Sequence, residues 1–290
     1  MDPARARRRH SMIQVFNHHA MATYFQVRLA VEDAAYAAQA ARAALDLTDH
    51  LETLLSRFQE NSEISAIARL EPGETQRLSE PTFACLQIAR QLEAFTQHAF
   101  CATPAARQTQ PELPGWSLDA TSLSLRCESG RVQLDLGAIG KGFALDRMAE
   151  VLLEWDCPAY LLVAGGSSIL AGAAPPGTPG WSSGLGDDHA KHRYWLQHCS
   201  LSGSGVAVKG QHIVDPLTGQ PASQRARAWA LTPTAATSDA LSTACMVLSE
   251  PEIQAMMSPC TEDWLVLLQD ADSWRTYGPR PLPPRAPEAP

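Results

Sequence analysis

The amino-acid sequence predicts an α+β fold in which mixed, largely antiparallel sheets pack against helices. Short apolar or alternating stretches, which are typical of strands, are interspersed with longer stretches of helical periodicity. No internal repeat is present, so a single mixed arrangement of helices and strands is indicated. The chain has 290 residues, of which 45% are hydrophobic, and this is enough for one large domain or two intimate lobes.

The expected helices follow from apolar residues at three- and four-residue spacing and from polar capping residues. They cover residues 32–57, 80–98, 142–154 and 237–249, and Ser79 or Thr82 is expected to cap the second. The expected strands are apolar or alternate in polarity, and they cover residues 24–30, 160–163, 194–196, 228–231 and 264–268. Residues 122–126 and 131–136 are expected to pair as a hairpin around Gly130. Glycine and proline predict loops over residues 104–115 and 172–190.

The two ends of the chain differ from its middle in composition. Residues 1–12 carry an arginine cluster and are expected to form a flexible tail, residues 13–278 the domain, and the proline-rich residues 279–290 a disordered tail. No apolar run approaches 18 residues, so no transmembrane span is predicted. No apolar segment follows the N-terminal arginines, so no secretory signal is predicted. The expected location is cytoplasmic for the sequence as it stands, and periplasmic or membrane-anchored if the N-terminus has been trimmed.

Charge and cysteine usage exclude some classes of function. The net charge of -8 at pH 7 argues against nucleic acid as a main partner. The seven cysteines are dispersed and include no Cys-x-x-Cys pair, which suits a reducing compartment. We therefore expect the thiols to be mostly buried packing residues.

The most informative segment is residues 134–146, where a short apolar strand runs into three glycines, a lysine and a helical pattern. Glycine lets the backbone approach a ligand closely, and Lys141 offers a point charge for phosphate. The spacing fits neither of the two common phosphate-binding loops. By itself the segment is therefore either a tight strand-to-helix turn or a turn that touches a ligand.

A second segment places oxygen ligands on one helical face. Asp239 and Thr243 lie four residues apart, which is one helical turn. A carboxylate, a hydroxyl and a nearby carbonyl are hard ligands suited to Mg²⁺, with substrate phosphate completing the coordination. The alternative is that Asp239 only caps the helix, because negative charge is favoured in the first turn.

Two further segments carry weaker signals. Residues 215–219 have the composition of a turn. His212 comes just before this turn, where it could act as a base or contact a ligand. The alternative is an ordinary packed or surface histidine. In residues 51–68 one helix is expected to end near Phe58 and another to begin after Ser62, which is its expected N-cap.

Taken in order, these segments resemble the FAD:protein FMN transferases, the ApbE family of flavin transferases, over roughly residues 13–270. The runs 135–146 and 212–219 are similar to the family's two long signatures, and 238–244 matches its Ala-Asp-Ala-Leu-Ser-Thr-Ala helix. The supporting elements are Met21-Ala22-Thr23, Leu55-Ser56-Arg57-Phe58 and Ser62-Glu63-Ile64-Ser65. The resemblance implies two lobes around a flavin-nucleotide cleft.

The resemblance also implies roles for individual residues. Mg²⁺ would be bound by the side chains of Asp239 and Thr243 and by the carbonyls of Ala138 and Ser242. FAD would lie against Lys141 with Asp135 nearby, and its flavin would meet Met21, Phe58, Ala99, Phe100, Cys101, His212 and Ile213. The catalytic residues would be Lys141, Asp239 and His212, with His212 or a carboxylate near the metal as the base.

The implied reaction moves FMN from FAD to a Ser or Thr hydroxyl of an acceptor protein and releases AMP. Several positions depart from the family pattern: Ala68 replaces an Asn, Cys101 replaces an Asp, and the turn that is usually Gly-Gly-Asp reads Gly165-Gly166-Ser167-Ser168. The motif that is usually Ser-Thr-Ser-Gly reads 202–205 as Ser-Gly-Ser-Gly. Three alternatives stay open: Mg²⁺-dependent hydrolysis of FAD to FMN and AMP, flavin binding without transfer, and a scaffold that binds no ligand.

Overall fold

The computed structural model describes residues 13–104, 114–185, 192–205, 213–216, 218–222, 224–270 and 273–287. The helices in these ranges are α1 (Ala34–Leu55), α2 (Glu63–Ile67), α3 (Glu80–Phe95), α5 (Gly140–Glu154), α6 (Ala235–Val247) and α7 (Glu250–Met257). The strands are β1 (Ile13–Ala20), β2 (Thr23–Ala30), β3 (Thr75–Arg77), β4 (Gly115–Asp119), β5 (Ser124–Ser129), β6 (Tyr160–Ala164), β7 (Ser168–Ala171), β8 (Trp181–Gly184), β9 (Arg193–Leu196), β10 (Cys199–Gly205), β11 (Arg227–Thr232), β12 (Leu265–Asp270) and β13 (Ser273–Tyr277).

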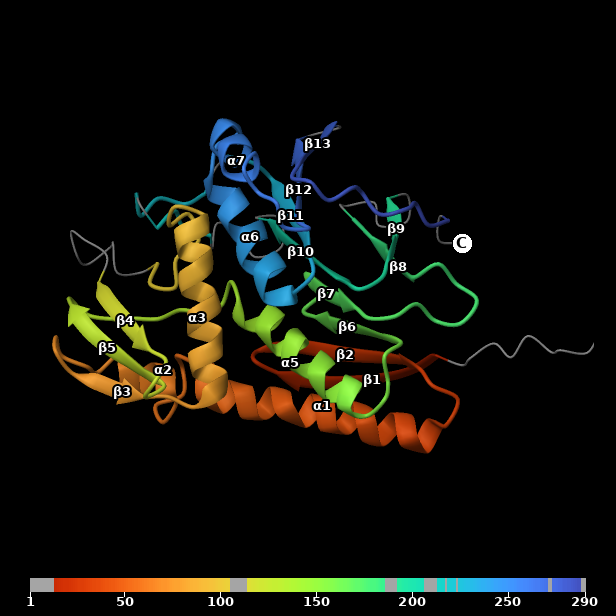
Figure 1. Cartoon of the computed structure of the whole chain (residues 1–290), viewed down its shortest axis with the longest axis horizontal. Coiled ribbons are helices and arrows are strands. Elements are labelled where there is room, and N and C mark those ends of the chain that lie inside the picture. Colours follow the sequence, from red (N-terminus) through yellow and green to blue (C-terminus); the bar gives the residue numbers. More distant parts are fainter. Residues whose placement is uncertain are drawn as a thin grey trace, which may run out of the picture.

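A large sheet organises the molecule, with the strand order β1-β2-β6-β7-β10-β11-β12-β13 (Figure 1). Every neighbouring pair in it is antiparallel. Antiparallel sheets permit short connections and do not need a helix between neighbouring strands. The predicted α+β class with largely antiparallel sheets is confirmed.

Helices α1, α5 and α6 cover one face of this sheet (Figure 1). Alternation along the strands decides which side chains meet them, because successive residues of a strand point to opposite faces. In β6, Leu162 joins the core beneath the helices, whereas Leu161 joins a separate cluster on the other face. The main core therefore lies between the helices and the sheet.

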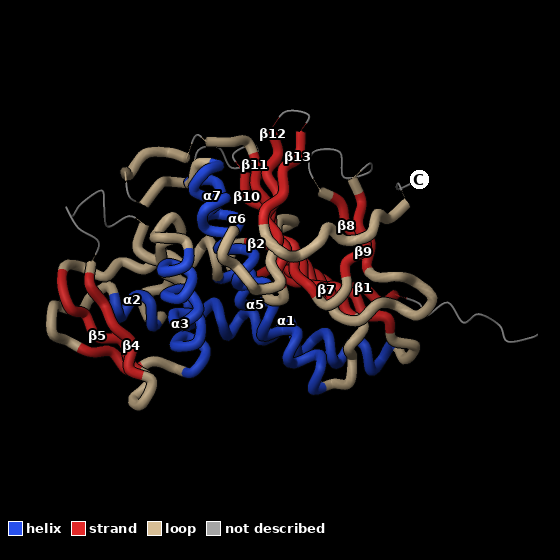
Figure 2. The backbone as a smooth tube through the Cα atoms, turned by 45° about the horizontal axis from the view of Figure 1, so that its top comes forward, coloured by secondary structure: helices blue, strands red, loops and turns tan. Residues whose placement is uncertain are grey.

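The opposite face of the sheet is covered by the pair β8–β9 and by the C-terminal segment (Figure 2). The backbone N–H of Trp195 donates to the carbonyl of Pro284 at 2.9 Å, and that of Ala286 donates to Arg193 at 2.9 Å. Pro284 and Ala286 thus bond to β9, and both lie in the segment 279–290 for which the sequence predicts a disordered tail. Proline removes donors from this segment, but an edge partner needs few of them. The expected flexible tail at residues 1–12 lies outside the described residues.

A smaller sheet, β3-β5-β4, lies beside α2 and α3 at one side of the molecule (Figure 2). Here the expected hairpin of residues 122–126 with 131–136 is wrong. β5 pairs instead with β4 before it and with β3. The turn between β4 and β5 is closed by Asp119, whose carboxylate accepts from the backbone N–H of Thr121 and the hydroxyl of Ser122. An aspartate that accepts hydrogen bonds from the residues after it can close a turn without glycine. The turn therefore follows Asp119 and not the strand before Gly130, where the sequence predicted it.

Most expected helices and strands are present with small shifts at their ends. Ser62 caps α2 by accepting from the backbone N–H of Ser65 at 3.0 Å, as predicted. Ser79 occupies the N-cap position of α3. The expected loop over residues 172–190 contains the strand β8, because Trp181 is buried against the sheet and donates to the carbonyl of Ala173.

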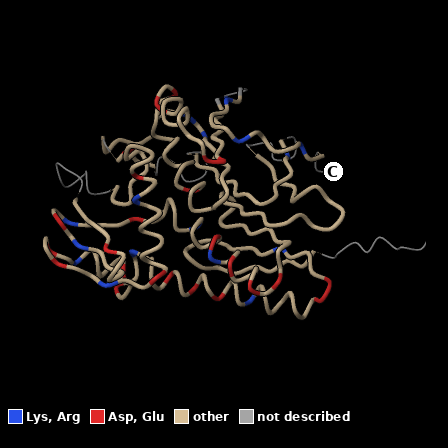
Figure 3. Tube along the Cα trace, in the orientation of Figure 1, with Lys and Arg blue, Asp and Glu red and all other residues tan. Residues whose placement is uncertain are grey.

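Charged residues gather around the small sheet and along α1 (Figure 3). The central strands β6, β7 and β10 carry none. Of the seven cysteines, six are buried and Cys260 is partly buried, and all are free thiols. In the described part of the chain, no helix has the length and apolarity needed to cross a bilayer.

Candidate active site

An ion pair between α5 and α6 forms the centre of the candidate site. Lys141 Nζ lies 3.2 Å from Oδ1 and 3.1 Å from Oδ2 of Asp239. The Asp239 side chain is 3% exposed and that of Lys141 is 19% exposed. The pair joins two segments 98 residues apart in the sequence. One charge is therefore buried and its partner reaches the surface.

Two further donors complete the surroundings of the Asp239 carboxylate. The Ser168 hydroxyl donates to Oδ1 at 3.0 Å, and the backbone N–H of Gly142 donates to Oδ2 at 3.2 Å. A buried carboxylate is stable only when it is paired and hydrogen-bonded. These contacts hold the carboxylate oxygens in a fixed position beside the start of α5.

Gly142 permits this close approach of the two helices. A Cβ atom at this position would lie 2.1 Å from the carbonyl oxygen of Ala235, at the start of α6. Any side chain here would push the helices apart. Gly142 is therefore required by helix packing, whether or not a ligand also approaches the backbone there.

Hydroxyl groups of β10 line the face of α6. Ser200, Ser202 and Ser204 alternate with apolar or small residues and point toward the helix. The Ser204 hydroxyl lies 3.1 Å from Thr243 Oγ1 and 2.9 Å from Ser242 Oγ. Thr243 donates to the backbone carbonyl of Asp239 at 3.1 Å. The predicted Asp239–Thr243 face is thus surrounded by hydroxyl oxygens.

The turn before α5 is held by its own aspartate. Asp135 Oδ1 accepts from the backbone N–H of Gly137 at 2.9 Å, and Asp135 Oδ2 lies 3.4 Å from an Arg57 guanidinium nitrogen. The backbone N–H of Asp135 donates to the carbonyl of Ala102 at 2.7 Å. The turn therefore joins the segment after α1 and the segment after α3. Lys141 Nζ also lies 3.4 Å from the carbonyl of Gly137.

Met21 lies in the two-residue turn between β1 and β2. Its backbone N–H donates to Glu52 Oε2 at 2.7 Å, and φ is +50° at Met21 and +54° at Ala22. Two-residue hairpin turns commonly have positive φ at both central residues, and this conformation is unfavourable for residues other than Gly, Asn and Asp. The methyl group of Met21 lies beside Gly140, at the start of α5.

The residues expected to meet the flavin differ in exposure. Phe58 is 83% exposed, and the Arg57 guanidinium stacks 4.6 Å from its ring centroid. Ala99, Phe100 and Cys101 are buried, and desolvation raises the pKa of the Cys101 thiol to about 11. Phe58 therefore offers exposed apolar surface. The segment 99–101 is buried and lies next to Ala102, whose carbonyl accepts from the backbone N–H of Asp135.

The structure does not describe His212, so its predicted role remains a prediction. Ile213 is buried in a second core cluster with residues of α6 and α7. The predicted turn after it is present in the described residues: the backbone N–H of Gly219 donates to Asp215 at 2.8 Å, and φ at Gly219 is +72°.

Asp239 does not cap α6, which answers the alternative raised by its sequence. The helix begins at Ala235, four residues before Asp239. The capping carboxylate comes from α5, where Asp146 accepts from the backbone N–H groups of Ala235 and Ala236 at 2.6 and 2.8 Å. Burial raises the pKa of Asp146 to about 7, although these two hydrogen bonds oppose the shift.

The expected ligand atoms fit Mg²⁺ in their chemistry, since they are oxygen atoms of the Asp239 carboxylate, the Thr243 hydroxyl and two backbone carbonyls. Ala138, whose carbonyl is an expected ligand, lies in the turn three residues before Lys141. Ser242 lies inside α6, so its carbonyl belongs to the helical hydrogen-bond ladder and keeps one lone pair. The described residues hold no cluster of three His, Cys, Asp or Glu side chains. Lys141 supplies the compensating cation in this structure.

Sequence reasoning missed Ser168, Gly142 and Asp146 as parts of this arrangement. Ser168 lies 71 residues from Asp239, and Asp146 lies 89 residues from Ala235. No local pattern reports such long-range pairs. Gly142 and Asp146 stand in the signature 135–146, and their four-residue spacing places them on one face of α5, which is the available signal.

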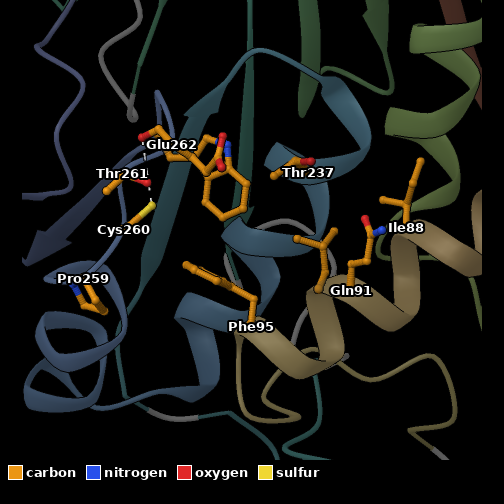
Figure 4. A pocket seen from close by; sticks show the side chains of 10 residues that line it. Ile88, Gln91, Phe95, Thr237, Pro259, Cys260, Thr261 and Glu262 are labelled. Atoms are coloured by element: carbon orange, nitrogen blue, oxygen red, sulfur yellow. Dashed lines mark hydrogen bonds between the residues drawn. The ribbon is translucent and has the colours of Figure 1, made fainter.

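A separate cavity of about 500 Å³ lies between α3, the first turn of α6 and the segment 259–264 (Figure 4). It is lined by Ile88, Gln91, Phe95, Thr237, Cys260 and Trp264, among others. Thr237 is two residues from Asp239 and so lies on a different face of α6. None of the predicted site residues lines this cavity. The converging polar groups at Asp239 identify the candidate active site better than the cavity does.

Solved flavin transferases share this fold. The structure of the flavin transferase ApbE from Vibrio cholerae superposes with a TM-score of 0.75 and 18% identity, covering 92% of this chain and 97% of that one. At this identity the likeness concerns the fold alone. A model of the ApbE family matches residues 21–264, and the chain belongs to this family.

Curated relatives carry the name FAD:protein FMN transferase. The protein of Treponema pallidum is 30% identical in an alignment 147 positions long, which covers 43% of this chain and 41% of that protein. The protein of Chlamydia muridarum is 29% identical in an alignment 213 positions long, which covers 63% of this chain and 66% of that protein. These alignments span between two fifths and two thirds of the relatives' own lengths.

Proposed function

We propose that this chain transfers FMN from FAD to a Ser or Thr hydroxyl of an acceptor protein and releases AMP. The observation that carries the proposal is the convergence of the two segments 135–146 and 238–244 at the Lys141–Asp239 pair. The name of the curated relatives and the family membership support the same activity.

The reaction is a phosphoryl transfer within the FAD pyrophosphate. A bond forms between the acceptor oxygen and the phosphorus of the FMN half, the bridging P–O bond to the AMP half breaks, and the hydroxyl proton leaves. Negative charge grows on the leaving phosphate, so fixed positive charge lowers the barrier. Lys141 is the cation at the site, and its partial exposure leaves it accessible to a substrate phosphate.

Mg²⁺ is proposed as the second source of positive charge. Asp239 and Thr243 would hold it through side chains, and Ala138 and Ser242 through carbonyls. When bound, it withdraws charge from the phosphates and orients them. Asp239 then has two cationic neighbours, and its bonds from Ser168 and Gly142 keep its orientation.

The flavin end of the substrate is proposed to lie near Met21, Phe58 and Asp135. These residues surround the turn before α5, since Met21 lies beside Gly140 and Arg57 joins Phe58 to Asp135. Ile213 and the buried segment 99–101 are proposed to form part of the walls of the flavin site. His212, or a carboxylate near the metal, is proposed to accept the hydroxyl proton.

The test is incubation with FAD, Mg²⁺ and acceptor domains that offer a surface Ser or Thr, followed by mass spectrometry of the acceptor. We expect a stable FMN adduct and an equal amount of AMP, both abolished by chelation of Mg²⁺. Lys141→Met keeps the length of the side chain without its charge and should slow AMP release by about a hundredfold. Free FMN with AMP and no adduct would instead identify a hydrolase, and intact FAD would identify a binding protein.

A further inference from the structure

Asp146 ends the signature 135–146 and has no part in the chemistry proposed above. It nevertheless makes the contacts that begin α6. Its two carboxylate oxygens each accept one backbone N–H, from Ala235 at 2.6 Å and from Ala236 at 2.8 Å. The side chain of the N-cap residue Thr234 does not accept a hydrogen bond from the first turn of α6. The first turn of a helix needs such acceptors because its N–H groups lack partners within the helix.

Three contacts join the starts of α5 and α6 on one face. Gly142 and Asp146 are four residues apart on α5, and Ala235 and Asp239 are four residues apart on α6. Asp146 binds the first turn of α6, Gly142 packs against the carbonyl of Ala235, and the N–H of Gly142 donates to Asp239. The two helices are thus aligned turn by turn, next to Lys141.

We propose that Asp146 is a positioning residue that fixes α6 against α5 and so sets the separation of Lys141 and Asp239. Lys141 and Asp239 belong to different helices, so the ion pair is only as well defined as the contact between those helices. In the proposed transfer reaction, on which the catalytic part of this inference rests, Asp146 acts through these two residues and touches no substrate.

The decisive variant is Asp146→Asn, which keeps the shape but turns one of the two acceptor oxygens into a donor facing a backbone N–H. A misplacement of about 1 Å at a catalytic group costs about a hundredfold in rate. We expect kcat for AMP release to fall at least about tenfold, with KM for FAD changed less than about threefold. Partial unfolding would also lower the apparent kcat at constant KM, so kcat is calculated per folded enzyme, with the folded fraction taken from the urea unfolding curve of the same preparation.

A second readout does not depend on catalysis. Acetylation of Lys141 by an amine-reactive ester is measured by peptide mass spectrometry, with Lys191 and Lys209 in the same chain as references. A weaker helix contact frees the Lys141 amine from Asp239 more often, so its labelling in Asp146→Asn should rise about tenfold.

The matched control is Asp33→Asn. Asp33 caps α1 through one oxygen, since Oδ1 accepts from the backbone N–H groups of both Ala35 and Tyr36, so asparagine keeps this cap while the same carboxylate charge is removed. This variant should leave both kcat and Lys141 labelling within about twofold of wild type. Unchanged Lys141 labelling in Asp146→Asn, or an equal rise in Asp33→Asn, overturns the inference. If the wild type shows no reaction with FAD, the proposed function fails, and the labelling result alone decides the role of Asp146.

Discussion

Asp239→Asn tests the centre of the site most directly. The carboxylate is buried and accepts from Lys141 Nζ at both oxygens, from the Ser168 hydroxyl and from the backbone N–H of Gly142. Asparagine has nearly the same size but presents a donor group where one oxygen was. In either orientation that amide group faces Lys141, and it also faces the N–H of Gly142 or the hydroxyl of Ser168, so at least one donor loses its acceptor.

The expected cost in folding stability follows from the burial of the two partners. Breaking a fully buried ion pair costs about 3–5 kcal/mol. The Lys141 side chain is 19% exposed and can turn toward water, so we expect a smaller loss of about 2–3 kcal/mol. Native domains have about 5–15 kcal/mol of stability. The variant therefore remains folded at room temperature, with a lower midpoint in urea.

Because the variant stays folded, the loss of stability alone would leave its activity nearly unchanged, but we expect a large loss of activity. Removing one electrostatic group that acts on the transition state costs about 10²–10³ in rate. The assay compares AMP release from FAD by chromatography with the urea unfolding curve of the same preparation. A folded variant with near-normal AMP release would show that Asp239 serves only helix packing. Asp33→Asn, which removes a carboxylate charge at a helix cap elsewhere but keeps the oxygen that accepts both backbone N–H groups, is the control for the exchange of Asp for Asn itself.

Three further predictions concern other residues around the site. Ala22→Gly should stabilise the protein by about 0.5–1 kcal/mol in urea unfolding, because φ is +54° at Ala22; a destabilised variant would refute strain at this turn. Phe58→Ala should change the unfolding free energy by less than about 0.5 kcal/mol, because the ring of Phe58 is 83% exposed. It should weaken FAD binding, measured by calorimetry, about tenfold, and an unchanged affinity would place the flavin elsewhere. The raised pKa of Asp146, about 7 against 3.8 for an ordinary aspartate, means that the folded state binds the additional proton. The unfolding free energy of wild type, measured relative to Asp146→Asn, should therefore fall as pH rises from about 4 to about 7, and a constant difference would contradict the shift.

The sequence by itself determined those elements whose signals are local. Ser62 predicts the start of α2, because its hydroxyl accepts from the N–H three residues later. The continuous apolar run of β6 predicts a buried strand, and it is found at the centre of the large sheet. The spacing of Asp239 and Thr243 predicts a shared helical face, and the described structure has the two residues one turn apart in α6.

The tertiary structure decided what depends on residues far apart in the chain. α6 begins at Ala235 because Asp146, 89 residues earlier, accepts its first N–H groups, whereas the sequence predicted a helix over residues 237–249. Pro284 and Ala286 find backbone hydrogen-bond partners in β9, which the composition of their own segment does not reveal. Lys141, Ser168 and Asp239 become one site only when three elements pack together. Hydrogen bonds within a turn are encoded by neighbouring residues, but the partners of a buried charge are fixed by the packing of the whole fold.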